Sequence, residues 1–195
     1  MNLLPLWRQL PNILSAARIG ASPLLGYLAA SGAEQYFTWL LVPALLSDVA
    51  DGYLARRFRL ASELGARLDS IADALLFFVA IFAVWALRPD VLQAHALAGL
   101  LVAGGWLLEI AAALVRYGRL SSFHTYASKV AGYLLGILIG ALFVWGLWPP
   151  LLYAAVAVSL AASVEELLLI ALLPEWRANV RGAWWVLRER RALPG

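Results

Sequence analysis

Six long apolar segments constrain the fold of this chain more than any other feature. They cover residues 11–31, 35–55, 66–87, 92–115, 127–147 and 150–173. A helix needs about 20 mostly apolar residues to cross a membrane, and these segments lack the alternation of membrane strands. Hydrophobic residues make up 63% of the chain and charged residues 14%, which excludes a disordered or an ordinary soluble protein. The sequence therefore predicts an all-α integral membrane protein with six transmembrane helices in one domain over residues 1–175.

Basic residues gather at alternate connections between these segments. Of the 15 Lys and Arg residues, only Arg88 falls outside the N-terminal end, the second and fourth connections and the tail. Because cytoplasmic loops are enriched in Lys and Arg, we expect both termini to be cytoplasmic. Residues 1–10 are expected to form an interfacial segment, and residues 176–195 a basic amphipathic cytoplasmic tail. The first apolar segment is too long and too interrupted for a cleaved signal peptide, so we expect it to be retained.

Four of the five aspartates lie within one short stretch, at the cytoplasmic ends of the second and third predicted spans. Asp48 and Asp51 are three residues apart, and Asp69 and Asp73 are four apart, so each pair shares one helix face. The short connection between the two helices suggests that they are antiparallel neighbours with their aspartates at the same depth. Ionisable groups within membrane spans are costly and commonly functional. We therefore expect the four carboxylates to form one site.

The composition of this stretch favours hard metal ions. Four carboxylates at close range repel one another unless cations neutralise them. The chain has no cysteine, and oxygen ligands alone favour Mg²⁺ or Mn²⁺ over zinc. Two such ions can clamp a phosphoryl group during its transfer. Gly52 and Gly65 remove side chains where a ligand would approach, and Arg56 can offer a planar fork to a phosphate.

Two alternatives remain open for the aspartates. They could form ordinary interfacial ion pairs with the arginines of the same region. They could also line the path of a divalent-cation transporter or channel, although acids near the midplane of several spans are expected there.

The fixed positions of this region form one frame, Asp48-x2-Asp51-Gly52-x2-Ala55-Arg56-x8-Gly65-x3-Asp69-x3-Asp73. The frame resembles the signature of the CDP-alcohol phosphotransferases, six-span membrane enzymes that transfer a phosphoalcohol unit from a CDP-alcohol to an acceptor hydroxyl and release CMP. The resemblance implies that two Mg²⁺ or Mn²⁺ ions are bound by Asp48, Asp51, Asp69 and Asp73. It implies that Asp73 is also the general base. It further implies a CDP-binding site lined by Gly52, Ala55, Arg56 and Gly65.

Other parts of the chain resemble the phosphatidylglycerophosphate synthase branch of that family. Residues 11–18 read Pro-Asn-Ile-Leu-Ser-x2-Arg, and Glu109 lies seven residues before Arg116. This likeness implies phospholipid biosynthesis with CDP-diacylglycerol as donor and a small polar acceptor, for which glycerol 3-phosphate is the best choice. The acceptor would be bound by Arg116, Lys129 and Arg119.

Other acceptors and roles also remain open. Ser70 is closer to the serine and inositol branches of the family, so serine and inositol phosphate are alternative acceptors. A soluble CDP-alcohol donor with a diacylglycerol acceptor is a further alternative. The last alternative is that the chain is a family member that binds lipid but catalyses no reaction.

Glycines on the fifth apolar segment suggest a close helix contact. Gly132, Gly136 and Gly140 form two small-x3-small steps on one helix face. This contact could lie within one molecule or between two, and the family resemblance favours a homodimer. The resemblance also implies a bacterial-type inner membrane with the active site facing the cytoplasm, and no nucleic-acid partner. No role is assigned to Glu165 or Glu166.

Overall fold

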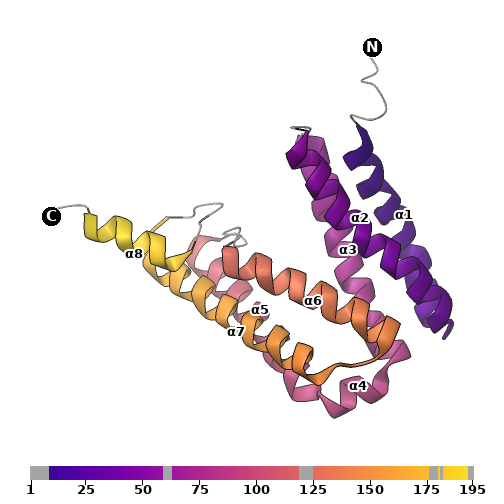
Figure 1. Cartoon of the computed structure of the whole chain (residues 1–195). Helices are drawn as coiled ribbons and strands as arrows, with labels where there is room; N and C mark the ends of the chain where they lie inside the picture. Colours follow the sequence, from indigo (N-terminus) through magenta and orange to yellow (C-terminus); the bar gives the residue numbers. More distant parts are fainter. Residues whose placement is uncertain (1–8, 59–62, 119–124, 176–179, 181, 193–195) are drawn as a thin grey trace. The chain divides into compact units, whose positions relative to one another are not determined.

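The computed structural model describes residues 9–58, 63–118, 125–175, 180 and 182–192. In these residues every regular element is helical, which confirms the predicted all-α fold (Figure 1). The helices are α1 (Leu10–Ala30), α2 (Glu34–Arg57), α3 (Glu63–Leu87), α4 (Pro89–Ala94), α5 (Ala96–Tyr117), α6 (Tyr126–Trp145), α7 (Pro149–Leu172) and α8 (Ala183–Ala192). They form two compact units, Met1–Ala94 with Phe143–Trp145 and His95–Leu142 with Gly146–Gly195.

Among the described residues, five helices are long and apolar enough to cross a membrane. These are α1, residues Arg67–Leu87 of α3, α5, α6 and α7. The remaining long helix, α2, has 24 residues, which at 1.5 Å per residue gives a length of about 36 Å. Its length therefore suffices for a span, but Glu34, Asp48, Asp51 and the arginine pair at its end lower its hydropathy. The structure thus shows several apolar helices typical of a multi-pass membrane protein.

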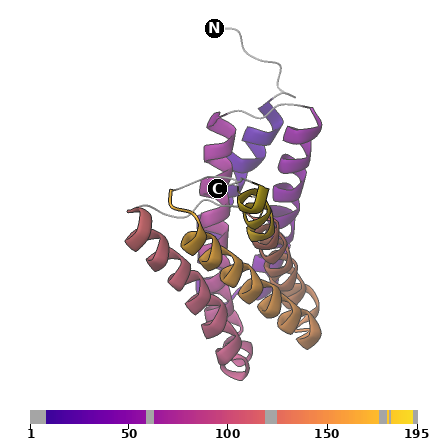
Figure 2. The ribbon, with the colours of Figure 1, turned by 90° about the vertical axis from the view of Figure 1, so that its left-hand side faces the viewer.

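In the first unit, α1 packs extensively against both α2 and α3. Viewed as in Figure 2, α1 lies between the other two helices. The short α2–α3 connection led us to expect that these two helices are close neighbours, but they contact each other only slightly. The order of helices along a chain does not determine which pair packs most closely. Leu25 on α1, Leu41 on α2 and Ala72 on α3 are fully buried in this unit.

The buried face of α1 carries polar side chains. Its buried residues recur at the spacing of one helix face: Pro11, Ser15, Arg18, Ser22, Leu25 and Ala29. The hydroxyl of Ser22 donates to the carbonyl oxygen of Arg18 at 2.8 Å, so this polar group is satisfied within the helix. The face of α1 that packs against α2 and α3 is therefore polar in its first half and apolar in its second half.

In the second unit, α5 packs against α7. A glycine at position 105 permits this contact, because a Cβ atom there would lie 2.8 Å from Ser163 Oγ and 3.3 Å from Ser163 Cβ. Further along the same two helices, Ala113 of α5 and Leu169 of α7 are fully buried. The backbone N–H of Ala183, the first residue of α8, donates to Glu165 Oε1 at 3.1 Å. Glu165, to which the sequence assigned no role, thus caps the start of α8.

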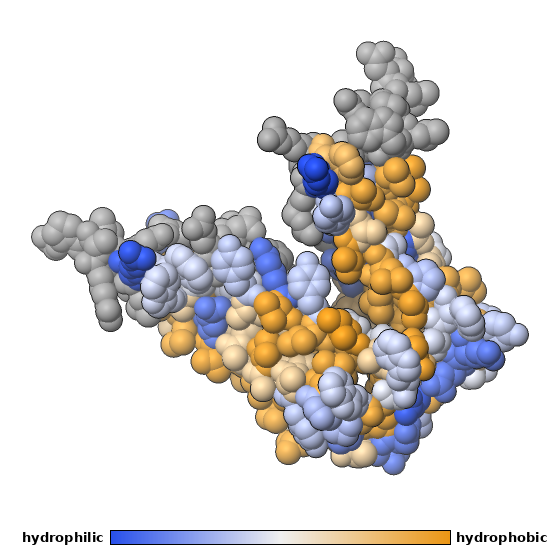
Figure 3. All heavy atoms as spheres, in the orientation of Figure 1, coloured by the Kyte–Doolittle hydropathy of each residue, from blue (hydrophilic) through white to orange (hydrophobic). Residues whose placement is uncertain are grey.

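Large apolar side chains remain exposed on the outer surfaces of the helices. Trp39 is 73% exposed, Leu100 70% and Val115 89%, and Figure 3 shows broad apolar areas on the face that it draws. Soluble monomers rarely expose contiguous apolar surface of this extent. A lipid environment accounts for it, because hydrocarbon tails can cover these side chains while the helices satisfy their own backbone groups.

Candidate metal centre

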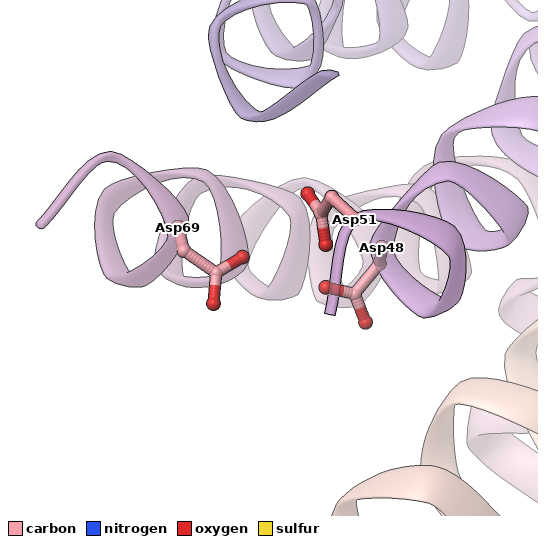
Figure 4. Close-up of side chains that lie close together, drawn as sticks. All are labelled: Asp48, Asp51 and Asp69. Carbon is pink, nitrogen blue, oxygen red and sulfur yellow. The ribbon is translucent and has the colours of Figure 1, made fainter. Parts of the chain in front are cut away.

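The four aspartates of the sequence frame lie on two helices of the first unit. Asp48 and Asp51 are on successive turns of α2, before its end at Arg57, and Asp69 and Asp73 are on successive turns near the start of α3. Carboxylate oxygens of Asp48, Asp51 and Asp69 lie within 4.8 Å of one another. Figure 4 shows the first two side chains leaving one helix and that of Asp69 leaving the other. The structure therefore brings residues from the two motif halves to one place.

Arg18 of α1 joins all four carboxylates. Its Nη2 atom donates to Asp51 Oδ2 at 2.7 Å and to Asp69 Oδ1 at 2.8 Å. Its Nη1 atom donates to Asp73 Oδ1 at 2.9 Å and also to Asp48 Oδ1. Arg18 is only 2% exposed, because α1 lies between the two helices that carry the aspartates. The planar guanidinium can contact four carboxylates at once because its donors point in different directions within one plane.

Burial differs sharply among the four carboxylates. The side chain of Asp51 is 4% exposed, whereas those of Asp48, Asp69 and Asp73 are 36%, 44% and 54% exposed. Asp51 also accepts a hydrogen bond from Ser15 Oγ of α1 at 3.1 Å. The site thus has a buried floor formed by α1 and Asp51 and an accessible rim formed by the other three aspartates.

The donor set of this site fits divalent cations. Four carboxylates against one guanidinium leave the site with excess negative charge when all are ionised. All donor atoms are oxygens, which suits hard ions such as Mg²⁺ or Mn²⁺. The mutual spacing of the Asp48, Asp51 and Asp69 oxygens allows one ion to contact all three. The residues present can therefore hold a divalent metal.

The residues predicted to bind CDP are only partly described. Gly52 directly follows Asp51 on α2, and Gly65 lies on α3 one helical turn before Asp69; both are partly exposed. The side chains of Ala55 and Arg56 fall outside the described residues. The described glycines therefore border the carboxylates on both helices, as the frame requires.

The residues predicted to bind the acceptor belong to the second unit and contact different partners. Arg116 donates from Nε and Nη2 to the carbonyl oxygen of Leu173, at 3.3 Å each. Tyr117 donates to the same carbonyl at 2.9 Å, so both side chains satisfy the C-terminal end of α7. Lys129 is exposed in the first turn of α6, with Nζ 5.8 Å from the centre of the Tyr126 ring. Arg119 lies outside the described residues.

Sequence reasoning missed Arg18 and Ser15 as parts of the site. From the sequence, Arg18 is only a topology signal and one position of the resemblance carried by residues 11–18. A stronger signal was available, because an arginine within an apolar span needs a partner of opposite charge. The chain has few acids, and four of its five aspartates belong to this frame. The spacing of Ser15, Arg18 and Ser22 also puts all three on one face of the first span.

Comparison with known proteins identifies relatives of limited coverage. The chain is 39% identical over 70 residues to "CDP-diacylglycerol--glycerol-3-phosphate 3-phosphatidyltransferase 2" of Arabidopsis thaliana, covering 34% of this chain and 30% of that protein. It is 41% identical over 70 residues to "CDP-diacylglycerol--glycerol-3-phosphate 3-phosphatidyltransferase" of Rickettsia bellii, covering 34% of this chain and 39% of the relative. It is 33% identical over 119 residues to the human "Cardiolipin synthase (CMP-forming)", covering 60% of this chain and 38% of that protein.

These matches span well under half the length of each relative. No solved structure matches the chain. The family model described as "CDP-alcohol phosphatidyltransferase" matches residues 8–165, a range that contains all four aspartates and Arg18. That range covers most of the chain, so the protein belongs to the CDP-alcohol phosphatidyltransferase family.

Proposed function

We propose that this protein transfers a phosphatidyl group from CDP-diacylglycerol to the hydroxyl of a small polar acceptor and releases CMP. The observation that carries the proposal is the convergence of four aspartates around one buried arginine, with three carboxylates accessible at the rim. An accessible, oxygen-rich site suits a metal-dependent reaction of a nucleotide diphosphate. An ion path would instead favour acids along the interior of several spans.

Asp48, Asp51 and Asp69 would hold two Mg²⁺ or Mn²⁺ ions, with Asp73 as a further ligand. When bound, the ions supply positive charge that stabilises the diphosphate and the departing CMP. Asp73 has the most exposed carboxylate of the four, which suits a group that must meet an incoming acceptor.

In the reaction, Asp73 removes the proton of the acceptor hydroxyl, and the acceptor oxygen attacks the phosphorus that carries diacylglycerol. The bond between that phosphorus and the bridging oxygen breaks, and CMP leaves with the electron pair. The CDP group is held by Gly52, Ala55, Arg56 and Gly65.

Glycerol 3-phosphate is the acceptor that we favour. Two of the relatives carry glycerol-3-phosphate in their names, and both are about 40% identical to the chain over the matched residues. A phosphorylated acceptor requires positive charge, which Arg116, Arg119 and Lys129 can supply. Cardiolipin synthesis is a second candidate, because the human cardiolipin synthase matches a larger share of this chain.

A panel of acceptors tests the proposal. Purified protein is incubated with CDP-diacylglycerol, Mg²⁺ or Mn²⁺, and glycerol 3-phosphate, inositol 1-phosphate, inositol, serine or phosphatidylglycerol, and CMP release is measured. We expect metal-dependent release with glycerol 3-phosphate. Release with phosphatidylglycerol alone would favour the second candidate. Failure to release CMP with any acceptor, in a folded protein that still binds CDP-diacylglycerol, would contradict the phosphatidyl-transfer assignment.

The membrane arrangement belongs to the same proposal. α2 forms a sixth span, both termini are cytoplasmic, and the site faces the cytoplasm of a bacterial-type inner membrane. Because the chain has no cysteine, single cysteines placed at Ser31 and Phe58, before and after α2, can be labelled selectively from either side of the membrane. We expect opposite sides for the two positions, and labelling from the same side would contradict the six-span arrangement.

The protein is also proposed to be a homodimer. Among the described residues, an added Cβ at Gly132 or Gly136 of α6 would meet no atom within 4 Å. This glycine face is therefore available for close contact with another helix. Cross-linking between single cysteines at Gly136 of two copies tests this contact.

A further inference from the structure

Arg18 takes the position that a cation needs in the four-aspartate site. Each of its two Nη atoms donates to two carboxylates, one on α2 and one on α3. One side chain therefore links both halves of the sequence frame. A divalent ion bound by the same carboxylates would make the same link between the two helices.

Within the described part of the chain, the four carboxylates hold the Arg18 guanidinium in place. Among these residues its buried Nε atom has no hydrogen-bond partner, although a guanidinium has five N–H donors. An unpaired buried donor is costly. The guanidinium thus keeps this pose because of its four ion pairs, and the pose is no longer favoured once the carboxylates find another cation.

The packing of the first unit explains why some cation is needed. α2 and α3 contact each other only slightly, while their aspartates face one another across Arg18. Four carboxylates without a cation between them would repel and push the two helices apart. Arg18 supplies the compensating charge from α1, the helix that packs against both.

We propose that Arg18 is the internal counter-ion of the metal-free site and competes with divalent metals for the same carboxylate oxygens. The inference rests on the metal site of the proposed function and adds a residue that sets its affinity. In the metal-free protein, Arg18 holds the aspartates together. As metal binds, the carboxylates exchange the guanidinium for the ions, because cations at such short distance repel each other. Arg18 is thereby a positioning residue that weakens metal binding and keeps the empty site assembled.

Metal affinity tests this competition without any substrate. Wild type, Arg18→Gln, Arg18→Lys and the control Arg88→Gln are purified in detergent without metal. Free Mn²⁺ is then followed by electron paramagnetic resonance during a titration, and folding is checked by circular dichroism. Arg88 belongs to the same unit but follows the end of α3, about 22 Å along the helix from Asp73 at 1.5 Å per residue.

We expect Arg18→Gln to bind Mn²⁺ about tenfold more tightly than wild type, or better, since the competing charge is gone. The Mn²⁺ affinity of Arg18→Lys should lie between those of wild type and Arg18→Gln, because an ammonium lacks the planar fork that reaches four carboxylates. Arg88→Gln should stay within about twofold of wild type, because Arg88 is distant from the site and already paired with Glu34 and Asp90. In thermal unfolding, metal-free Arg18→Gln should be less stable than wild type, and Mn²⁺ should raise its melting temperature more.

Equal or weaker Mn²⁺ binding by folded Arg18→Gln would overturn the competition, as would an equal gain in Arg88→Gln. If Arg18→Gln does not fold, Arg18→Lys decides, and wild-type affinity in that variant also overturns the inference. If Arg18→Gln binds Mn²⁺ no more tightly than wild type but the protein still releases CMP in a metal-dependent way, the competition is refuted and the proposed function stands. Absence of Mn²⁺ binding in wild type would refute the metal site itself and the competition with it.

Discussion

The hydrogen bond between Ser15 and Asp51 gives a quantitative test of how α1 supports the site. Ser15 Oγ lies 3.1 Å from Asp51 Oδ2 and also 3.1 Å from the carbonyl oxygen of Pro11, and Ser15 and Asp51 are 3% and 4% exposed. A hydrogen bond to an ionised group contributes about 1.5–3 kcal/mol. Replacing serine by alanine within a helix returns about 0.5 kcal/mol through helix propensity. We therefore expect Ser15→Ala to lower the free energy of unfolding by about 1–2.5 kcal/mol.

Ser22→Ala is the matched control for this substitution. Ser22 lies on the same buried face of α1, but its hydroxyl bonds only to the backbone carbonyl of Arg18 within the described contacts. Removal of such a bond four residues back in a helix is nearly neutral. For a chain of this size, 1 kcal/mol corresponds to about 2–4 °C in melting temperature. Both substitutions gain the same helix propensity, so the two variants differ by about 1.5–3 kcal/mol, the contribution of the bond to Asp51. Ser15→Ala should therefore melt about 3–12 °C below Ser22→Ala, in metal-free detergent solution followed by tryptophan fluorescence.

The comparison of the two variants can refute the reasoning directly. Equal melting temperatures for Ser15→Ala and Ser22→Ala would mean that the hydroxyl of Ser15 contributes nothing to holding Asp51. Ser15→Ala should also release CMP more slowly than Ser22→Ala, because a less restrained Asp51 binds metal less well. Equal rates would contradict that part of the argument.

Two further predictions concern the second unit. Gly105→Ala should destabilise it by about 1–3 kcal/mol relative to Gly104→Ala. The reason is that an added Cβ meets Ser163 at position 105, whereas at position 104 it meets no atom of the described residues within 4 Å. Equal melting temperatures would contradict the close packing of α5 on α7. Glu165→Ala should remove the cap of α8, which contributes about 1 kcal/mol, and so speed hydrogen exchange in residues 183–192. Unchanged exchange there would show that Glu165 does not hold the start of α8 through Ala183.

Helix periodicity and hydropathy were sufficient to predict the long helices and the grouping of the aspartates. Each aspartate pair lies on one face because helical residues three or four apart do so in any context. Hydropathy located the five described helices that are long and apolar enough to cross a membrane, because a long apolar segment has few other uses. It did not separate α4 (Pro89–Ala94) from α5, since a short break between two helices hardly changes the mean hydropathy of an apolar segment.

The position of α1 could not be predicted in this way. Which helices pack together depends on how side chains of distant segments fit, and hydropathy describes each segment alone. The role of Arg18 depends on that packing, because its guanidinium reaches four carboxylates only when α1 lies between α2 and α3. The contacts of Arg116 with the end of α7 depend likewise on the approach of α5 to α7. Local spacing thus predicts which residues can act together on one or two helices, whereas a third helix enters the site through tertiary packing.

The central claim is that the four aspartates form a metal-dependent transferase site, and Asp69→Asn tests it most directly. The control is Asp90→Asn, an exposed acid outside the spanning segments. Hydrogen bonds from Arg88 lower the pKa of Asp90, so this control also removes one negative charge at neutral pH. CMP release from CDP-diacylglycerol is measured with Mg²⁺ and glycerol 3-phosphate. We predict that Asp69→Asn, folded and inserted in the membrane, loses at least about a thousandfold in rate, while Asp90→Asn retains the wild-type rate. Near-wild-type release by Asp69→Asn would contradict the metal assignment and the function proposed from it.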